Sequence, residues 1–98
     1  MSVYLENTIQ SLQRLKPLLT DKYHIKNIGL FGSVVRDDFS ADNSDVDILV
    51  DFTKPIGIEF IDLSNLLEKE LGRSVDVVSR NGIKEKYYKE IEKEIAYV

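Results

Sequence analysis

Hydrophobic residues recur at helical spacing in three parts of the chain. In residues 3–19 the apolar positions fall three or four residues apart, which predicts an amphipathic helix with a kink or a new turn at Pro17. The same spacing in residues 58–71 predicts a second helix, and Gly72 follows as a suitable C-terminal cap. Residues 83–96 predict a final helix with a strongly charged surface. The apolar residues of these stripes are the predicted core.

Three shorter apolar runs predict β-strands. They lie at residues 26–31, at residues 45–52, where acidic and apolar residues alternate before an apolar run, and at residues 74–79. The third run reads Val-Asp-Val-Val from Val75 to Val78, so a single acid stands among valines. The chain is therefore expected to build a sheet of three strands.

The segments between the strands predict how the elements are connected. A short helix is expected at residues 34–38, and a polar loop with strong turn chemistry at residues 39–44. The order is helix, strand, short helix, strand, helix, strand, helix, which predicts one α/β (or α+β) domain over residues 1–98. We expect a small mixed three-stranded sheet flanked by about four helices, packed mainly on one face.

The composition narrows the classes of function. Of 98 residues, 43% are hydrophobic and 31% are charged, as in ordinary globular proteins. The absence of cysteine excludes disulfides and thiolate metal sites, so a metal would need oxygen ligands or the single His24, which is not expected to be a ligand. The net charge of −4 argues against nucleic acid held through its phosphates and fits a protein partner better. With no signal-peptide pattern and no apolar run near the ~20 residues of a membrane span, we expect a soluble, cytoplasmic protein with no membrane partner.

Two acids at the start of the second strand are candidate metal ligands. Asp45 and Asp47 are two residues apart, so on a strand they share one face, about 7 Å apart along the backbone. A divalent cation would remove their repulsion, and hard cations such as Mg²⁺ prefer oxygen ligands. Asp76 would complete a site for one or two ions if the third strand pairs beside the second. The alternative is a strand edge with solvated acids, which is the interpretation we give to Asp51 near the end of the strand.

Gly32 and Ser33 form a candidate phosphate site. A strand that ends in Gly-Ser and opens into a helix presents backbone N–H groups to an anion, while the serine can cap the helix. Arg36 lies one turn further on, where its charge could offset that of phosphates. Ser44 is a candidate either to steady the carboxylates or to contact phosphate. The alternative for the arginine is an ion pair with a nearby acid, for which the candidates are Asp37, Asp38 and Asp42.

These motifs together resemble one known family. Gly32-Ser-x-x-Arg36, the polar loop, Ser44-Asp45-x-Asp47 and a lone Asp76 in a later strand are similar to the minimal nucleotidyltransferases of the DNA polymerase β superfamily. The resemblance covers nearly the whole chain. It implies that the three aspartates are Mg²⁺ ligands and catalytic residues, with Asp76 also suited to activate the acceptor hydroxyl. It further implies that Gly32 and Ser33 bind the nucleotide phosphates.

The sequence departs from the family at one point. Many relatives read Ala-Arg-Gly around the arginine, whereas this chain reads Val35-Arg36-Asp37. The missing glycine alters the turn after the short helix, and the added acid counts against phosphate affinity there.

The resemblance also implies a partner and a reaction. Members of the family are often antitoxins encoded beside a HEPN-domain toxin, and those studied transfer AMP from ATP to a tyrosine of that toxin. We therefore expect an Mg²⁺-dependent nucleotidyltransferase that uses ATP, modifies a hydroxyl of such a partner and acts as its antitoxin. The alternative hypothesis is a non-catalytic binding module that neutralises the partner by covering its active site.

Overall fold

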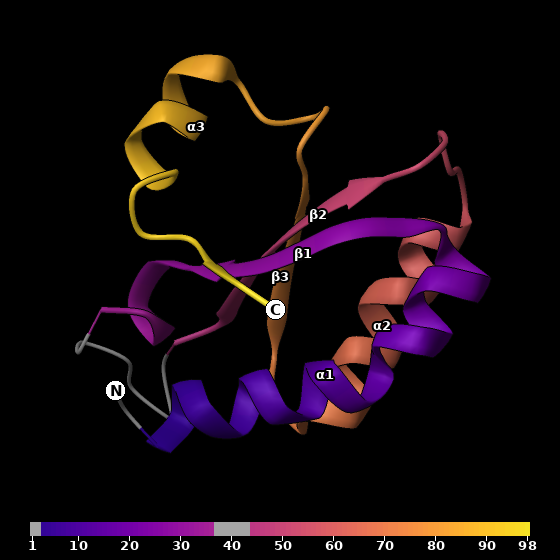
Figure 1. The fold of residues 1–98 in the computed structure, drawn as a ribbon, viewed down its shortest axis with the longest axis horizontal. Coiled ribbons are helices and arrows are strands. Elements are labelled where there is room, and N and C mark those ends of the chain that lie inside the picture. The colour runs from indigo at the N-terminus through magenta and orange to yellow at the C-terminus, as the bar shows by residue number, and fades with distance from the viewer. Residues whose placement is uncertain (1–2, 37–43) are drawn as a thin grey trace.

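The computed structural model describes residues 3–36 and 44–98, and these form a four-stranded sheet between helices (Figure 1). The α/β class predicted from the sequence is confirmed. In chain order the elements are α1 (Val3–Tyr23), β1 (Ile25–Phe31), the 3₁₀ turn η1 (Gly32–Val34), β2 (Val46–Phe52), α2 (Glu59–Leu71), β3 (Val75–Ser79), α3 (Glu85–Ile91) and β4 (Ala96–Tyr97). In this part of the chain, no helix is long and apolar enough to cross a membrane.

The sheet has the strand order β3-β2-β1-β4. β2 and β3 run parallel and are joined through α2, whereas β1 is antiparallel to both of its neighbours. The register sets Asp47 of β2 between Phe31 of β1 and Asp76 of β3. Because directly paired residues point to the same face of a sheet, these three side chains share one face.

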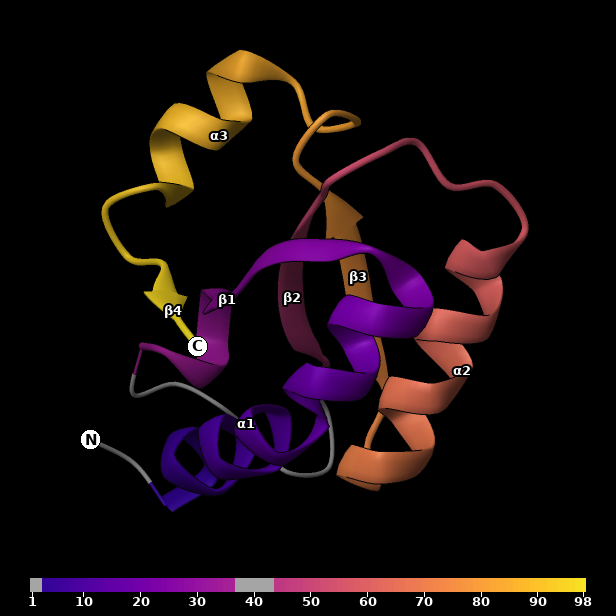
Figure 2. The same cartoon turned by 45° about the vertical axis from the view of Figure 1, so that its right-hand side comes forward.

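Helices α1 and α2 cover the opposite face of the sheet, as Figure 2 shows. Their stripe positions and the alternate residues of the strands form the main core, in which the fully buried side chains include Leu12, Leu19, Leu30, Ile48, Val50, Leu63 and Leu67. α1 continues beyond residue 19 to Tyr23, with Pro17 inside it, so a separate turn beginning at Pro17 is wrong. The helix continues because Leu19 and Tyr23 extend its buried stripe. Gly72 ends α2 in the left-handed conformation, as expected.

The last helix lies on the other side of the sheet from α1 and α2 (Figure 1). Its Ile91 is buried with Phe31 and Leu49 in a second, smaller apolar cluster. The two long helices thus share one face, as expected, and only the seven-residue α3 lies on the other. Phe31 lies on β1 and Leu49 on β2, so these two strands have buried side chains on both faces of the sheet.

The C-terminal end of the chain differs from the sequence prediction. α3 ends at Ile91 instead of residue 96, and Ala96–Tyr97 form a fourth strand against Gly29 and Leu30. Gly29 makes room for this, because a Cβ there would lie 2.6 Å from Ile95 Cγ2. Pairing satisfies the backbone groups of an edge strand, which outweighs helix propensity in a short charged segment. The short helix expected at residues 34–38 is only the turn η1, and residues 37–43, with most of the expected loop, lie outside the described residues.

Candidate active site

Three aspartates gather at the edge of the sheet where β2 and β3 begin. Asp47 is half-buried on β2, and Asp76 lies directly beside it on the parallel strand β3. Asp45 is exposed and immediately precedes β2, two residues from Asp47. The topology thus places side by side the carboxylates that the sequence spacing could only suggest as neighbours.

The electrostatic environment of Asp47 is unfavourable for a charge. The pKa of this carboxyl is raised to about 6, first by burial and then by the neighbouring charges of Asp76 and Asp45, which together outweigh the opposing effect of the Arg36 guanidinium. Such a shift is typical of functional carboxylates. Nothing in the packing of β2 requires an acid here.

These carboxylates fit a hard divalent cation by their chemistry. Ionised aspartates offer only acceptor oxygens, and a cation between them would remove their mutual repulsion. In the ranges 3–36 and 44–98, no three His, Cys, Asp or Glu side chains stand close enough together to form a ready metal cage. Asp45 and Asp76 are both exposed, so their side chains are free of the packing that would stop them rotating toward an ion.

Gly32 brings the end of β1 into contact with this acidic group. Its φ is +75°, a conformation that side chains other than glycine rarely adopt, and a Cβ at this position would collide with Asp47 Oδ2. Both features require glycine. The Gly-Ser motif is therefore held against the carboxylates by close backbone approach.

The turn after Gly32 is shorter than the sequence suggested. η1 is a single 3₁₀ turn, the residue at its N-cap is Phe31, and no side chain caps it, so the expected capping role of Ser33 is wrong. The N–H groups of Val35 and Arg36 both donate to the Gly32 carbonyl, each at 3.1 Å. A helix this short has almost no macrodipole, so an anion here would rely on the Gly32 N–H and the Arg36 side chain.

Glu94 is a site residue that sequence reasoning missed. Its carboxylate accepts a hydrogen bond from the Gly32 N–H at 3.3 Å and forms an ion pair with Arg36 Nη1 at 3.2 Å. The arginine was expected to pair, if at all, with Asp37, Asp38 or Asp42, which lie outside the described residues. The sequence predicts a continuous helix over residues 83–96, in which the charge of Glu94 resembles those of its neighbours, so no sequence signal distinguishes it. Ser44 is half-buried, directly before Asp45.

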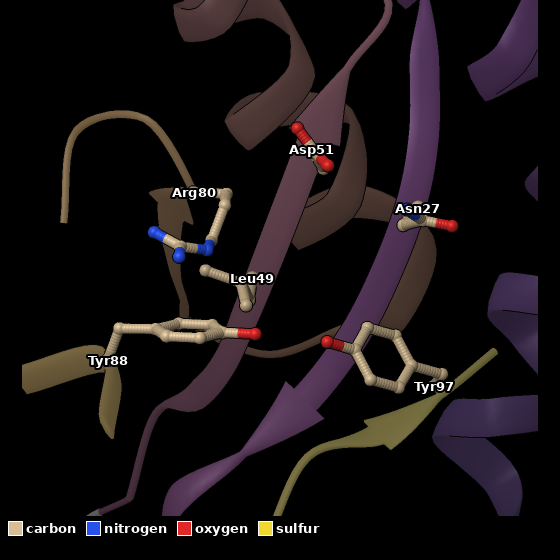
Figure 3. Close-up of a pocket in the computed structure, with 6 residues that line it drawn as sticks. All are labelled: Asn27, Leu49, Asp51, Arg80, Tyr88 and Tyr97. Atoms are coloured by element: carbon tan, nitrogen blue, oxygen red, sulfur yellow. The ribbon is translucent and has the colours of Figure 1, made fainter. Parts of the chain in front are cut away.

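A pocket lies further along the same face of the sheet. Its cavity of about 180 Å³ is lined by Asn27, Leu49, Asp51, Arg80, Tyr88 and Tyr97, all drawn in Figure 3. The Arg80 guanidinium lies 3.6 Å above the centre of the Tyr88 ring. A hydrogen bond with Tyr88 and partial burial raise the pKa of Tyr97. Figure 3 shows the hydroxyls of Tyr88 and Tyr97 pointing toward each other.

Asp51 belongs to this pocket and not to the three-aspartate group. It is half-buried, so the interpretation as a solvated edge charge is wrong. It lies four positions after Asp47 on β2, which corresponds to about 13 Å along a strand. It shares the face but lies beyond reach of a metal held at Asp47.

A family model, a sequence relative and a solved structure all relate this chain to the nucleotidyltransferases. The family model described as "Nucleotidyltransferase domain" matches residues 9–98. The protein adenylyltransferase MntA of Thermococcus cleftensis is 40% identical over 95 residues, which cover 96% of this chain and 95% of that protein. A solved candidate minimal nucleotidyltransferase superposes with a TM-score of 0.79 at 27% identity, covering 94% of this chain and 93% of the other. The MntA–HpeT toxin–antitoxin structure shares the fold, with a TM-score of 0.66 at 19% identity over 95% of this chain and 70% of the other.

Proposed function

This chain belongs to the nucleotidyltransferase domain family and is an enzyme of that class, and from this premise we propose that it transfers AMP from ATP to a tyrosine hydroxyl of a partner toxin. The observation that carries the proposal is the pairing of Asp47 with Asp76 beside Gly32 and Arg36. That arrangement unites oxygen ligands for a cation with donors for phosphate. The reaction belongs in the cytoplasm, where ATP and Mg²⁺ are available.

Each residue of the site has a proposed role. Asp45, Asp47 and Asp76 would hold Mg²⁺, which when bound would neutralise phosphate charge and the charge that develops on the leaving group. The Gly32 N–H and the Arg36 guanidinium bind phosphate oxygens, because charge-assisted hydrogen bonds to phosphate are strong. Ser33 follows Gly32 and Ser44 precedes Asp45, and both are half-buried residues that we assign to phosphate contact. Asp47, the most buried of the three acids, fixes the position of the site.

The proposed reaction is a simple displacement at phosphorus. The acceptor oxygen forms a bond to the α-phosphorus of ATP, while the bond from that phosphorus to pyrophosphate breaks. The proton of the acceptor hydroxyl passes to a carboxylate. Asp76 is the candidate base because it is exposed at the mouth of the site, where an acceptor would arrive.

Two observations support a protein as the acceptor. The relative from Thermococcus cleftensis is named a protein adenylyltransferase, and the MntA–HpeT structure that shares the fold is a toxin–antitoxin pair. The net charge of −4 is unfavourable for an RNA acceptor. We propose that the partner is a HEPN-domain toxin and that this chain is its antitoxin.

The direct test follows the label of α-³²P-ATP in the presence of Mg²⁺ and the product of the adjacent gene. We expect label on a tyrosine of the partner with the wild type and none with Asp47→Asn. Asp51→Asn is the matched control, since it removes the same charge from the same strand face but outside the site. It should transfer label like the wild type. Absence of label on the partner with the wild type would contradict the proposal.

The non-catalytic alternative is distinguished by toxicity. If the chain acts only by covering the active site of the toxin, Asp47→Asn neutralises the toxin fully although it transfers no label. If AMP transfer is the mechanism, the same variant leaves the toxin active. Growth of cells that express the toxin with each antitoxin variant separates the two.

A further inference from the structure

One carboxylate of the chain occupies the groups that we assign to phosphate. Glu94 Oε1 accepts a hydrogen bond from the Gly32 N–H at 3.3 Å and another from Arg36 Nη1 at 3.4 Å, while Oε2 lies 3.2 Å from the same nitrogen. Its side chain is only 21% exposed, so it lies within the site and not above it. Two carboxylate oxygens on a backbone N–H and a guanidinium reproduce the way in which these groups would hold a phosphate.

Glu94 places a negative charge beside the acidic group, where it is one of the charges that raise the pKa of Asp47. The same Gly32 that donates to Glu94 lies against Asp47 Oδ2, so the two carboxylates flank one residue. Asp76 stands beside Asp47 on the next strand. A glutamate here adds a further negative charge to an acidic group, and Arg36 is its only described cationic partner. A residue needed only to fasten the chain would serve better without a charge.

The backbone around Glu94 is fixed, so any displacement of this residue is a movement of its side chain. Ile95 packs over Gly29, and Ala96 and Tyr97 pair with β1. The Val98 N–H donates to the Ile28 carbonyl at 2.9 Å, which continues that pairing to the last residue. Rotation of the Glu94 side chain would break its contacts with the Gly32 N–H and Arg36 Nη1 without unfolding β4.

We propose that Glu94 is an internal competitor for the nucleotide phosphates, and that it sets the affinity of the site by occupying the Gly32 N–H and Arg36 until a triphosphate displaces it. This inference rests on the proposed function for the identity of the ligand. The exchange is easy in the forward direction because the Arg36 side chain is 57% exposed, and exposed ion pairs contribute little to stability. A triphosphate brings several negative charges and a bound cation, which together favour it over a single carboxylate.

The test measures binding and not turnover. Inorganic tripolyphosphate is titrated, with Mg²⁺ present, into the wild type, into Glu94→Gln and into the matched control Glu92→Gln, an exposed residue of the same segment. Glutamine keeps the size of the side chain and removes its charge. We expect Glu94→Gln to bind tripolyphosphate about fivefold more tightly than the wild type, and Glu92→Gln to bind like the wild type. Unchanged or weaker binding by Glu94→Gln would overturn the proposal, since it would mean a structural or ligand-contacting role.

A second measurement does not depend on the variant folding. In the wild type the amide resonance of Gly32 should move when tripolyphosphate replaces the Glu94 carboxylate as its acceptor, and a resonance that stays in place would overturn the proposal. The outcome is separable from that of the proposed function. Tighter binding by Glu94→Gln without AMP transfer by the wild type would count against the transferase proposal alone. AMP transfer with no effect of Glu94→Gln would count against the competitor alone.

Discussion

The two faces of the sheet are built by different rules. The face under α1 and α2 is a continuous apolar core in which Leu12, Ile48 and Leu67 are fully buried. The other face carries Asp47, Asp76 and Asp51, with only a small apolar cluster around Leu49. The first face stabilises the fold by burial, while the second concentrates like charges at the cost of stability. This difference supports the proposal that the second face holds the metal and the nucleotide.

The largest effect should come from Asp47. Asp47→Asn removes the most buried acid of the site, and we expect AMP transfer to fall by about a thousandfold, since loss of charge stabilisation of ~4 kcal/mol corresponds to that factor. Without metal, the variant should be at least as stable as the wild type near neutral pH. Initial rates and denaturant titrations of the same preparations measure both. Loss of stability together with activity in Asp47→Asn would contradict the view that this face serves ligand binding and not the fold.

A substitution on the covered face, which is the face under α1 and α2, should lower stability and leave activity unchanged. Leu67→Ala leaves a cavity at a fully buried position of α2, and we expect unfolding free energy to fall by about 3 kcal/mol and Tm by about 15 °C. The activity of the folded fraction should not change. Ile61→Ala on the same helix, where the side chain is 62% exposed, is the control and should be nearly neutral. Thermal melts and rates below the transition test this, and an activity loss specific to Leu67→Ala would contradict it.

Alanine substitutions at two glycines with positive φ distinguish the effect of backbone strain from the effect of site geometry. Gly32 and Gly72 have φ of +75° and +66°, so alanine at either position should cost about 1 kcal/mol. At Gly72 nothing lies within 4 Å of a Cβ, whereas at Gly32 the new methyl group meets Asp47. We expect only Gly32→Ala to lower nucleotide transfer, by at least about tenfold at equal folded concentration. Equal activities of the two variants would show that the close approach of Gly32 to Asp47 is unimportant.

The smallest effect is on the pH dependence of stability. The pKa of Asp47 is raised to about 6 from an ordinary value of 3.8, so the folded state holds this proton more tightly than the unfolded state. Its contribution to stability is therefore present below about pH 4 and is lost as the pH rises through 6. Because the carboxylate is partly exposed, we expect Asp47→Asn to gain only about 1 kcal/mol over the metal-free wild type across this range. Denaturant titrations from pH 4 to 8 measure this, and a constant difference between the two proteins would contradict it.

Much of the fold can be predicted from the sequence because buried positions recur at the period of the helix or strand that carries them. The stripes of α1 and α2 and the apolar runs of β1, β2 and β3 predicted these elements to within a few residues. The C-terminal strand was not predictable in this way. Ala96 and Tyr97 pair with β1 because Gly29 leaves room for Ile95, which is a tertiary relation that no local pattern of charges expresses.

The candidate site can be predicted from the sequence only in part. The motif residues Gly32, Asp47 and Asp76 could be proposed from residue type and spacing, and the parallel pairing of β2 with β3 places the two acids together. Glu94 could not be proposed, since it reaches Gly32 from 62 residues away through the unpredicted end of the chain. Residues that depend on such long-range contacts lie beyond sequence patterns.

The measurement that tests the central claim most directly is the paramagnetic broadening of amide signals by Mn²⁺ in place of Mg²⁺, with ATP present. Substoichiometric Mn²⁺ should broaden the amides of Gly32, Asp47 and Asp76 first and leave those of Leu63 and Leu67 on the covered face sharp. Asp47→Asn should abolish the broadening at the same ion concentration. Broadening centred on other acids, such as those of α3, or broadening that survives Asp47→Asn, would contradict the assignment of this face as the metal and nucleotide site.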